Sequence, residues 1–225
     1  SMVTEGMPSL TRDLKVHGMP VGVAAVDVHS IGAGGGSIAW IDKGGALMVG
    51  PQSAGAEPGP ACYDQGGEQP TCTDANIVLG YINPDFFLGG RRKIDPDLSK
   101  RAIENYIAKP LGMSAPEAAY GIFRIINNNM VDAIRVVSVE RGIDPRHYSL
   151  VSGGGAGNIH AGMLGRTLDM TKVIIPRYSG VFCSFGMIVS DVRHDYMQAL
   201  ATNTERFDLE AVNGVLKDME DKAIQ

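Results

Sequence analysis

Short apolar runs that end at glycines mark the first part of the chain. Residues 21–28 form an apolar stretch that leads to a glycine-rich turn at 32–36, and two further stretches, 38–42 and 46–49, flank a Lys-Gly-Gly sequence. Two apolar runs joined by a short glycine-containing turn are typical of a β-hairpin. The pattern therefore predicts a strand over 21–28 followed by a hairpin.

A helical period replaces this pattern further along the chain. Apolar side chains recur on one stripe between residues 95 and 108, after a proline at the first helical position, which is typical of an amphipathic helix. Residues 75–80 form a shorter apolar segment behind two polar residues. Because threonine and aspartate both serve as N-caps, either Thr73 or Asp74 is expected to begin this helix.

The longest predicted helix covers residues 116–141. Ser114 and Glu117 have the spacing of a capping box, and Gly142 is the kind of residue that ends a helix. Three consecutive asparagines, 127–129, interrupt it, although asparagine is a poor helix former. We interpret them as a solvated helix face; the alternative is an amide that contacts a ligand or a neighbouring domain.

A β-α-β unit is predicted in the C-terminal half. The apolar run 149–152 precedes four glycines in the five positions 153–157, residues 158–168 have a helical pattern, and 172–176 read as a strand. Two strands joined by a helix in this way lie parallel. Residues 179–192 are apolar and small, and we expect them to form a helix that packs on the sheet.

Between these elements, residues 50–70 are rich in proline and glycine and lack any periodic apolar pattern. A structureless loop of this length is uncommon in a compact domain, and it is usually functional or disordered. Cys62 lies within it as a candidate nucleophile, but no partner histidine is identifiable. We therefore favour the interpretation that Cys62 is a buried or unreactive thiol.

Composition narrows the classes of function. Hydrophobic residues make up 44% of the 225 residues, enough for a real core, and the net charge of −5 with no basic run argues against a nucleic-acid partner. No apolar stretch reaches the roughly 18 residues of a membrane span. Three widely spaced cysteines without a C-x-x-C pair favour a reduced, cytoplasmic protein over a disulfide or zinc framework.

The glycine turn at 153–157 is the most informative stretch. A strand, a tight turn and a helix start aim free backbone N–H groups and the positive end of a helix dipole at one point, which suits a phosphate or an adenine nucleotide. Neither this turn nor 32–36 has the lysine of a P-loop or the G-x-G-x-x-G spacing of a dinucleotide fold. Tight turns and close helix–sheet packing are the alternative role of these glycines.

Two polar groups near chain turns are further candidates. Asp27 and His29 lie two positions apart, so in a strand they project from the same face, where they could hold a metal or orient a substrate. A hydrogen-bonded strand end is the alternative that we prefer. Asp191, His194 and Asp195 form a second group, for which a buried network is preferred and Mg²⁺ contact is the alternative.

His160 follows the glycine turn within the same predicted helix. It is close enough along the chain to contact a nucleotide bound at the turn. A single histidine inside a helix is more often structural, so both roles stay open. The last segment, 207–225, has an amphipathic helical pattern without a C-cap, from which we expect the chain to be cut from a longer protein.

Three long runs together go beyond composition and spacing. They occupy residues 27–40, then 50–63 with 70–76, and then 136–142 continuing to 153–160 and 191–196. On these runs the chain resembles the hydantoinase A/5-oxoprolinase family, which also contains the ATP-binding subunits of acetone and acetophenone carboxylases.

The resemblance implies an α/β fold: the second half of an actin-like ATPase core of the sugar kinase and Hsp70 type, with a mixed sheet and flanking helices. In such a core ATP, with Mg²⁺, activates a lactam, imide or ketone oxygen by phosphorylation. The family's Asp-x-Gly-Gly-Thr phosphate motifs are absent from the chain. The resemblance accordingly implies that residues 3–225 are the C-terminal half of the core, with a Gly/Pro-rich insertion at about 50–112, and we interpret 1–2 as a cloning remnant.

The family's site residues carry over by position. Gly153, Gly154, Gly155 and Gly157 match the adenosine-side motif, and Asn158 continues it as a cofactor-binding candidate. The same resemblance makes the run containing Asp27 and His29 face the cleft, with its role unassigned, and these two are the catalytic candidates. The metal candidates, Asp191 and His194, come from the second polar group and not from the resemblance.

The implied activity is ATP-dependent hydrolysis of a cyclic amide of the hydantoin, N-methylhydantoin or 5-oxoproline type, with a second subunit of the hydantoinase B type as partner. The alternatives are the ATP-binding subunit of a carboxylase that acts on a ketone, or a non-catalytic assembly module.

Overall fold

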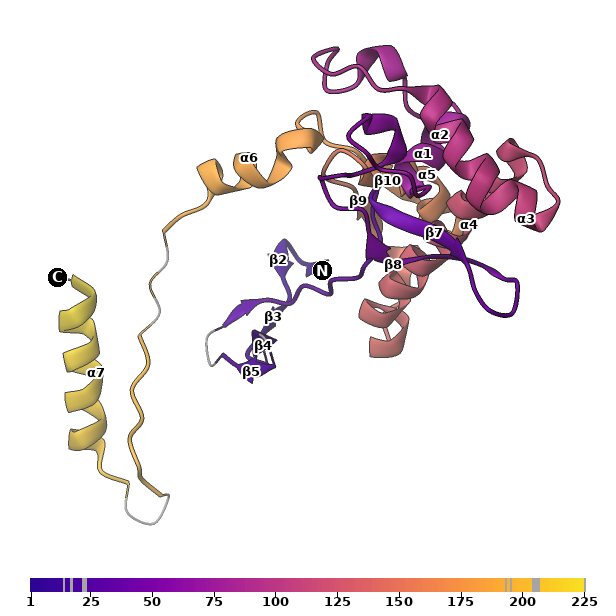
Figure 1. Ribbon diagram of the computed structural model, residues 1–225. Coiled ribbons are helices and arrows are strands. Elements are labelled where there is room, and N and C mark those ends of the chain that lie inside the picture. Colours follow the sequence, from indigo (N-terminus) through magenta and orange to yellow (C-terminus); the bar gives the residue numbers. More distant parts are fainter. Residues whose placement is uncertain are drawn as a thin grey trace. The chain divides into compact units, whose positions relative to one another are not determined.

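The computed structural model describes residues 1–13, 15–16, 18–21, 24–192, 194, 196–203 and 207–224. The chain divides into two compact units, Ser1–Phe182 and Cys183–Gln225, and each is described by itself (Figure 1). The α-helices are α1 (Cys72–Val78), α2 (Pro96–Ile103), α3 (Lys109–Leu111), α4 (Ala115–Val137), α5 (Gly157–Thr167), α6 (Phe182–Val189) and α7 (Leu209–Ile224). The strands are β1 (Val3–Thr4), β2 (Met7–Pro8), β3 (Leu10–Thr11), β4 (Lys15–Val16), β5 (Met19–Pro20), β6 (Ala25–Val26), β7 (Ser37–Ile41), β8 (Leu47–Ser53), β9 (Ser149–Val151) and β10 (Lys172–Ile174).

The strands pair in twos. Within the described residues β1–β2, β3–β6, β4–β5 and β7–β8 are antiparallel, and β9–β10 is parallel. The fold is thus mixed α/β, but the strands do not join into the single mixed sheet that was expected. The early strands are only two residues long because turns such as Glu5-Gly6, both with positive φ, reverse the chain at once.

The strand predicted over 21–28 is much shorter in the structure. Gly22 and Val23 lie outside the described residues, and the strand β6 contains only Ala25 and Val26, with Val26 opposite Leu10 of β3. The predicted hairpin is confirmed as β7 and β8, with Trp40 opposite Met48. The indole N–H of Trp40 donates to the carbonyl of Gly50 at 2.9 Å, so this partly exposed ring also fixes the end of the hairpin.

Helix α4 is the centre of the first unit. The predicted capping box is present, with the Ser114 hydroxyl accepting from the Glu117 N–H and the Glu117 carboxylate accepting from the Ser114 N–H. Ile122 and Ile126 are fully buried against side chains of α1, the α2–α3 region and the β7–β8 hairpin. Burial of such side chains contributes about 1.5–3 kcal/mol each.

The end of α4 was predicted four residues too late. The helix stops at Val137, Ser138 leaves the helical region, and its hydroxyl donates back to the Ile134 carbonyl at 2.6 Å. A separate 3₁₀ turn, Val139–Arg141, then leads to Gly142 in the left-handed conformation. Gly142 does end a helical element, but this element is the 3₁₀ turn and not the long helix.

The solvated-face interpretation of the asparagine run is wrong for its first member. Asn127 is 2% exposed, and its Nδ2 donates to the Phe123 carbonyl at 2.6 Å, while its Oδ1 has no partner. Asn128 and Asn129 are exposed, as expected. Because the run spans less than one helical turn, its members cannot all lie on one face.

Helix α1 begins two to three residues earlier than predicted. Thr71 is the N-cap: its hydroxyl accepts from the Asp74 N–H, and the Asp74 carboxylate accepts from the Thr71 N–H. Asp74 therefore belongs to a capping box at the third helical position and is not itself the cap. The predicted amphipathic helix after Asp95 is confirmed as α2, which continues through a π-helical segment, Glu104–Ala108, into α3.

The segment 50–70 is ordered by the same carboxylate. Asp74, fully buried, also accepts from the backbone N–H groups of Ala61 and Cys62 at 3.2 and 3.0 Å and from the Ser99 hydroxyl at 2.7 Å. A buried carboxylate needs several donors to compensate for its lost hydration. The loop 50–70 is fixed in place because its Ala61 and Cys62 N–H groups are two of these donors.

The predicted parallel β-α-β unit is confirmed. Strand β9 pairs with β10 in register from Ser149↔Lys172 to Val151↔Ile174, and α5 connects them. Helix and strand approach closely at Gly165, where a Cβ would come within 2.3 Å of the Val173 Cγ2. Leu164 and Leu168 pack with Val131 of α4 and join this unit to the central helix.

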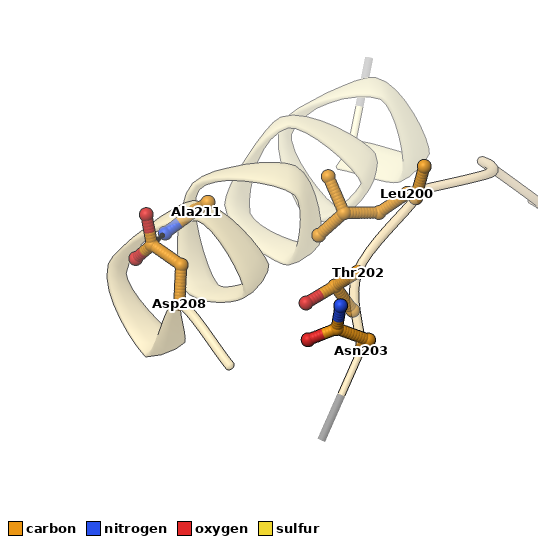
Figure 2. Close-up of a pocket in the computed structure, with 6 residues that line it drawn as sticks. Leu200, Thr202, Asn203, Asp208 and Ala211 are labelled. Carbon is orange, nitrogen blue, oxygen red and sulfur yellow. Dashed lines mark hydrogen bonds between the residues drawn. The ribbon is translucent and has the colours of Figure 1, made fainter. Parts of the chain in front are cut away.

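The second unit contains most of α6 and all of α7. Both helices were predicted, and none of the residues of α6 is buried. The expected packing of α6 on the sheet stays a prediction. Figure 2 shows a surface hollow beside the start of α7, where the Asp208 carboxylate accepts from the N–H groups of Glu210 and Ala211 at 3.0 Å and caps the helix.

Candidate functional site

The two glycine-rich turns meet at one hollow in the first unit. The hollow has a volume of about 420 Å³, and it lies where the turn at 32–36, the loop 50–70, α1 and the start of α5 come together. Its lining residues are Gly35, Gly36, Gly55, Pro60, Tyr63, Thr73, Asn76, Ile82, Phe87, Leu88, Gly155, Ala156 and Ile159. Residues about 120 positions apart in the chain therefore share one site.

Helix α1 positions the first turn. The backbone N–H and the hydroxyl of Thr73 both donate to the Gly35 carbonyl, at 2.8 and 2.9 Å. A Cβ on Gly35 would lie 2.7 Å from that hydroxyl and 3.8 Å from the Cβ of Ala156. Only glycine allows the turn to approach both α1 and the second turn this closely.

The second turn is shaped by its own hydrogen bonds. Gly154 has φ +91°, and its N–H donates to the Ser179 carbonyl at 2.7 Å. Asn158, predicted to bind a cofactor, uses its Nδ2 to donate to the Gly154 carbonyl and the Ser179 hydroxyl, at 2.8 and 3.0 Å. Its amide nitrogen thus holds the turn in shape.

The four predicted glycines have different surroundings. A Cβ on Gly153 would come within 2.9 Å of the Phe182 ring, whereas a Cβ on Gly155 would meet nothing within 4 Å. Gly155 borders the hollow, and α5 begins at Gly157 without a side-chain cap. The first N–H groups of a helix lack acceptors within the helix itself, so the start of α5 could offer donors to an anion, although the Ile159 N–H already donates to the Ala156 carbonyl at 3.2 Å.

Aromatic and aliphatic side chains form another part of the wall. The rings of Tyr63 and Phe87 lie 5.7 Å apart with a tilt of 48°, and the Arg92 guanidinium lies 4.3 Å above the Tyr63 ring. Arg92 also donates to the Tyr63 carbonyl at 3.3 Å. Burial is the main cause that raises the pKa of Tyr63, so the phenol stays neutral at physiological pH.

A buried polar cluster joins α1 to α5. The Sγ of Cys72 is 3.7 Å from the Nε2 of His160, and the Nδ2 of Asn76 donates to the same sulfur at 3.6 Å. The His160 ring stacks on Phe123 with centroids 5.2 Å apart. Burial lowers the pKa of His160 and raises the pKa of Cys72 to about 12, so both groups are neutral. His160 does not line the hollow, which favours its structural role.

Cys62 is a buried thiol, as preferred from the sequence. It is fully buried, and burial followed by the charge of Asp74 raises the pKa of its thiol far above the usual range. A thiol that does not ionise is no nucleophile.

The structure gives Asp27 a partner other than His29. The Asp27 carboxylate pairs with the Arg141 guanidinium, and this hydrogen bond is the main cause that lowers the pKa of Asp27. His29 is exposed, and neither residue lines the hollow. This arrangement agrees with the hydrogen-bonded strand end.

No metal site assembles in the part of the chain that the structure describes. Asp191 and His194 are exposed residues of the second unit, so the buried network preferred for them is not found, and Asp195 lies outside the described residues. Groups of three or more histidine, cysteine, aspartate or glutamate side chains that could hold a metal are absent from the described residues. The hollow itself has no carboxylate in its lining, so its residues do not fit a directly bound Mg²⁺.

Sequence reasoning missed the residues that give the hollow its walls. Tyr63 ends a short 3₁₀ helix, Phe87 follows another, and Asn76 lies in the second half of α1. A fully buried asparagine with an unused oxygen is unusual, but burial is not readable from the sequence.

The model for the hydantoinase/oxoprolinase family matches residues 1–196, most of the chain. The chain belongs to this family. It is 41% identical over 221 residues to the caprolactamase subunit alpha of Pseudomonas jessenii, which covers 97% of the chain and 32% of the relative. It is 42% identical to the acetophenone carboxylase gamma subunit of Aromatoleum aromaticum, over 91% of the chain and 29% of the relative.

A solved structure agrees with the sequence comparison. The crystal structure of the ATP-dependent caprolactamase from Pseudomonas jessenii matches 96% of this chain with a TM-score of 0.77 and 41% identity, and the match covers 31% of that chain. The family member described here thus spans less than a third of the length of these relatives. Among its described residues, no helix is both long and apolar enough to cross a membrane.

Proposed function

We propose that this chain is the nucleotide-binding part of an ATP-dependent enzyme that activates a cyclic amide by phosphorylation for hydrolysis. The observation that carries the proposal is the hollow at which the two glycine turns meet. It combines an apolar wall of Tyr63 and Phe87 with the start of α5, which has no side-chain cap. A nucleotide needs both, because its base is flat and weakly polar while its phosphates need donors.

The parent enzyme has, in this proposal, an actin-like core of which the chain is the C-terminal half. Gly153, Gly154, Gly155 and Gly157 hold the adenosine side of ATP. Mg²⁺ then depends on the phosphates and on protein outside this chain, because the hollow offers no carboxylate. The cyclic amide and a partner subunit of the hydantoinase B type complete the active enzyme, which we place in the cytoplasm. The named relatives are subunits, which supports a multisubunit assembly.

A carboxylase is the second candidate. The chain is as similar to an acetophenone carboxylase subunit, at 42% identity, as to a caprolactamase subunit, at 41%. The hollow serves ATP in either enzyme. The difference lies in the acceptor of the phosphate, and no residue of the hollow separates the two.

Calorimetric titration of Mg-ADP into the chain tests the proposal. Gly155→Val fills the hollow without strain, because a Cβ there meets nothing and φ is not positive. Gly162→Ala is the matched control on the exposed part of the same helix. We expect saturable binding by the parent chain and by Gly162→Ala, and at least about a tenfold loss in Gly155→Val. Equal binding by all three proteins would place the nucleotide elsewhere, and absence of binding by the parent chain would overturn the hollow as a nucleotide site.

A further inference from the structure

Asn76, a residue of the wall of the hollow, has an unused and buried hydrogen-bond acceptor. The residue is 1% exposed and lines the hollow from α1. Its Nδ2 donates to the Cys72 Sγ at 3.6 Å, and its Oδ1 has no partner. A buried carbonyl oxygen without a donor costs free energy, which a ligand can recover by supplying an N–H.

The orientation of the Asn76 amide follows from its neighbours. The Cys72 sulfur accepts from the Nδ2 and lies 3.7 Å from the Nε2 of His160, to which its S–H can donate. Each of these atoms then has a partner of the right kind. In this arrangement the Nδ2 lies on the sulfur side and the Oδ1 is the free group, while the Nδ1 of His160 is likewise without a partner.

The rest of the hollow suits a flat heterocycle. Tyr63 and Phe87 provide ring surfaces, and Ile82 and Ile159 add aliphatic contacts. Among the lining side chains, those of Thr73 and Tyr63 are the other polar ones. The Thr73 hydroxyl already donates to Gly35. Beside these ring and aliphatic surfaces, the unused Oδ1 of Asn76 favours a ring that carries an N–H donor.

We propose that Asn76 selects the base of the nucleotide, with its Oδ1 accepting a hydrogen bond from the exocyclic amine of adenine. This inference rests on the proposed nucleotide function and adds its base specificity. Hypoxanthine, which has a carbonyl oxygen in place of the amine, would set two acceptors against each other and leave both without a donor. The site then distinguishes adenine from an oxo-purine by one contact.

Paired titrations of Mg-ADP and Mg-IDP into the chain test this inference. We expect the parent chain to bind ADP about tenfold more tightly than IDP, since the wrong base leaves a buried acceptor without a donor. In Asn76→Leu, which keeps the volume but removes the acceptor, the ratio of the two dissociation constants should fall to about one. Thermal unfolding of each variant verifies that it is folded.

Asn127→Leu is the matched control. Asn127 is equally buried and also has a free Oδ1, but it does not line the hollow. It should therefore keep the ADP:IDP ratio of the parent chain. If Asn76→Leu does not fold, Cys72→Ala provides a second test, because it frees the Nδ2 and lets the amide reverse, which should reduce the preference for ADP.

The outcomes separate the inference from the function beneath it. Binding of both nucleotides with equal affinity by the parent chain, or an unchanged ratio in Asn76→Leu, would overturn base selection and leave the nucleotide site standing. If the parent chain binds neither ADP nor IDP, both the base selection and the proposed nucleotide site are overturned. A cyclic amide also carries an N–H, so hydantoin is titrated in a third arm. Competition between hydantoin and ADP that is lost in Asn76→Leu would assign the Oδ1 to the substrate ring and overturn its assignment to adenine.

Discussion

The carboxylate of Asp74 accepts a hydrogen bond from the backbone N–H of Cys62 at 3.0 Å, across twelve positions of the chain. With the bonds from Ala61, Thr71 and Ser99, this contact fastens the loop 50–70 to the first turn of α1. The loop carries Tyr63 into the wall of the hollow. The buried Asp74 side chain therefore sets the position of the part of the wall that contains Tyr63.

Replacing Asp74 should consequently destabilise the protein and open the hollow. Asp74→Ala leaves several buried donors without an acceptor, and we expect a loss of about 2–4 kcal/mol in the free energy of unfolding. Urea denaturation measures the change, with the exposed residue variant Asp85→Ala as control. A loss below about 1 kcal/mol would show that water replaces the carboxylate and that the loop does not depend on it.

The free energy of unfolding should depend on pH through His160. Its pKa is below 6.5 in the folded protein because burial disfavours the charged form, while the unfolded chain takes up a proton near 6.5. Between these two values the unfolded state binds more protons, so stability falls as the pH decreases from about 7 toward the folded pKa. Denaturation at several pH values should show this slope in the parent chain and a weaker one in His160→Leu. The variant His147→Gln, at an exposed histidine, should keep the slope, and an equal slope in His160→Leu would assign it to other groups.

The Thr73 hydroxyl should matter to the first glycine turn. Thr73→Val keeps the shape of the side chain and the backbone hydrogen bond, but it removes the donor to the Gly35 carbonyl. We expect about 1 kcal/mol of lost stability and a several-fold weaker binding of Mg-ADP, because the turn borders the hollow. Thr167→Val, which removes a comparable hydroxyl bond on the far end of α5, should lower stability only. Equal ADP affinity in both variants would contradict a role of the turn in binding.

The close contact of α5 with β10 predicts that one substitution destabilises the protein and that a second, compensating substitution restores part of the stability. Gly165→Ala places a methyl group 2.3 Å from the Val173 Cγ2, and such overpacking costs about 1–3 kcal/mol. Val173→Ala in the same chain should restore part of the loss, since it removes the clashing methyl groups. Thermal unfolding of the single and double variants measures the coupling. Strictly additive losses would mean that the two elements move apart freely.

The features that the sequence predicted correctly are those that depend on near neighbours. The Ser114–Glu117 capping box, the β7–β8 hairpin and the β9–α5–β10 unit each follow from residues within one short segment. The errors occur where a distant contact decides. The Asp74 carboxylate holds the loop at Ala61, thirteen positions away, which the sequence did not indicate. The N-cap of α1 is an exception, because Thr71 and Asp74 form a capping box only three positions apart.

The candidate site was only half predictable for the same reason. The two glycine turns are visible in the sequence, whereas their meeting at the hollow depends on the packing of α1 between them. Asn76 and Phe87 acquire their roles only in the folded unit, and Asp27 is engaged by Arg141, 114 positions away. Spacing along the chain carries no information about such distances.

Trp40 gives the protein a natural optical reporter. It is the single tryptophan of the chain, and its indole N–H is bonded to the Gly50 carbonyl, while a Cβ on Gly50 would lie 3.0 Å from the Gly32 carbonyl. The fluorescence of this ring therefore originates next to the first glycine turn and from nowhere else in the chain. A shift of its emission during a titration would follow the turn itself as the hollow fills, without any label.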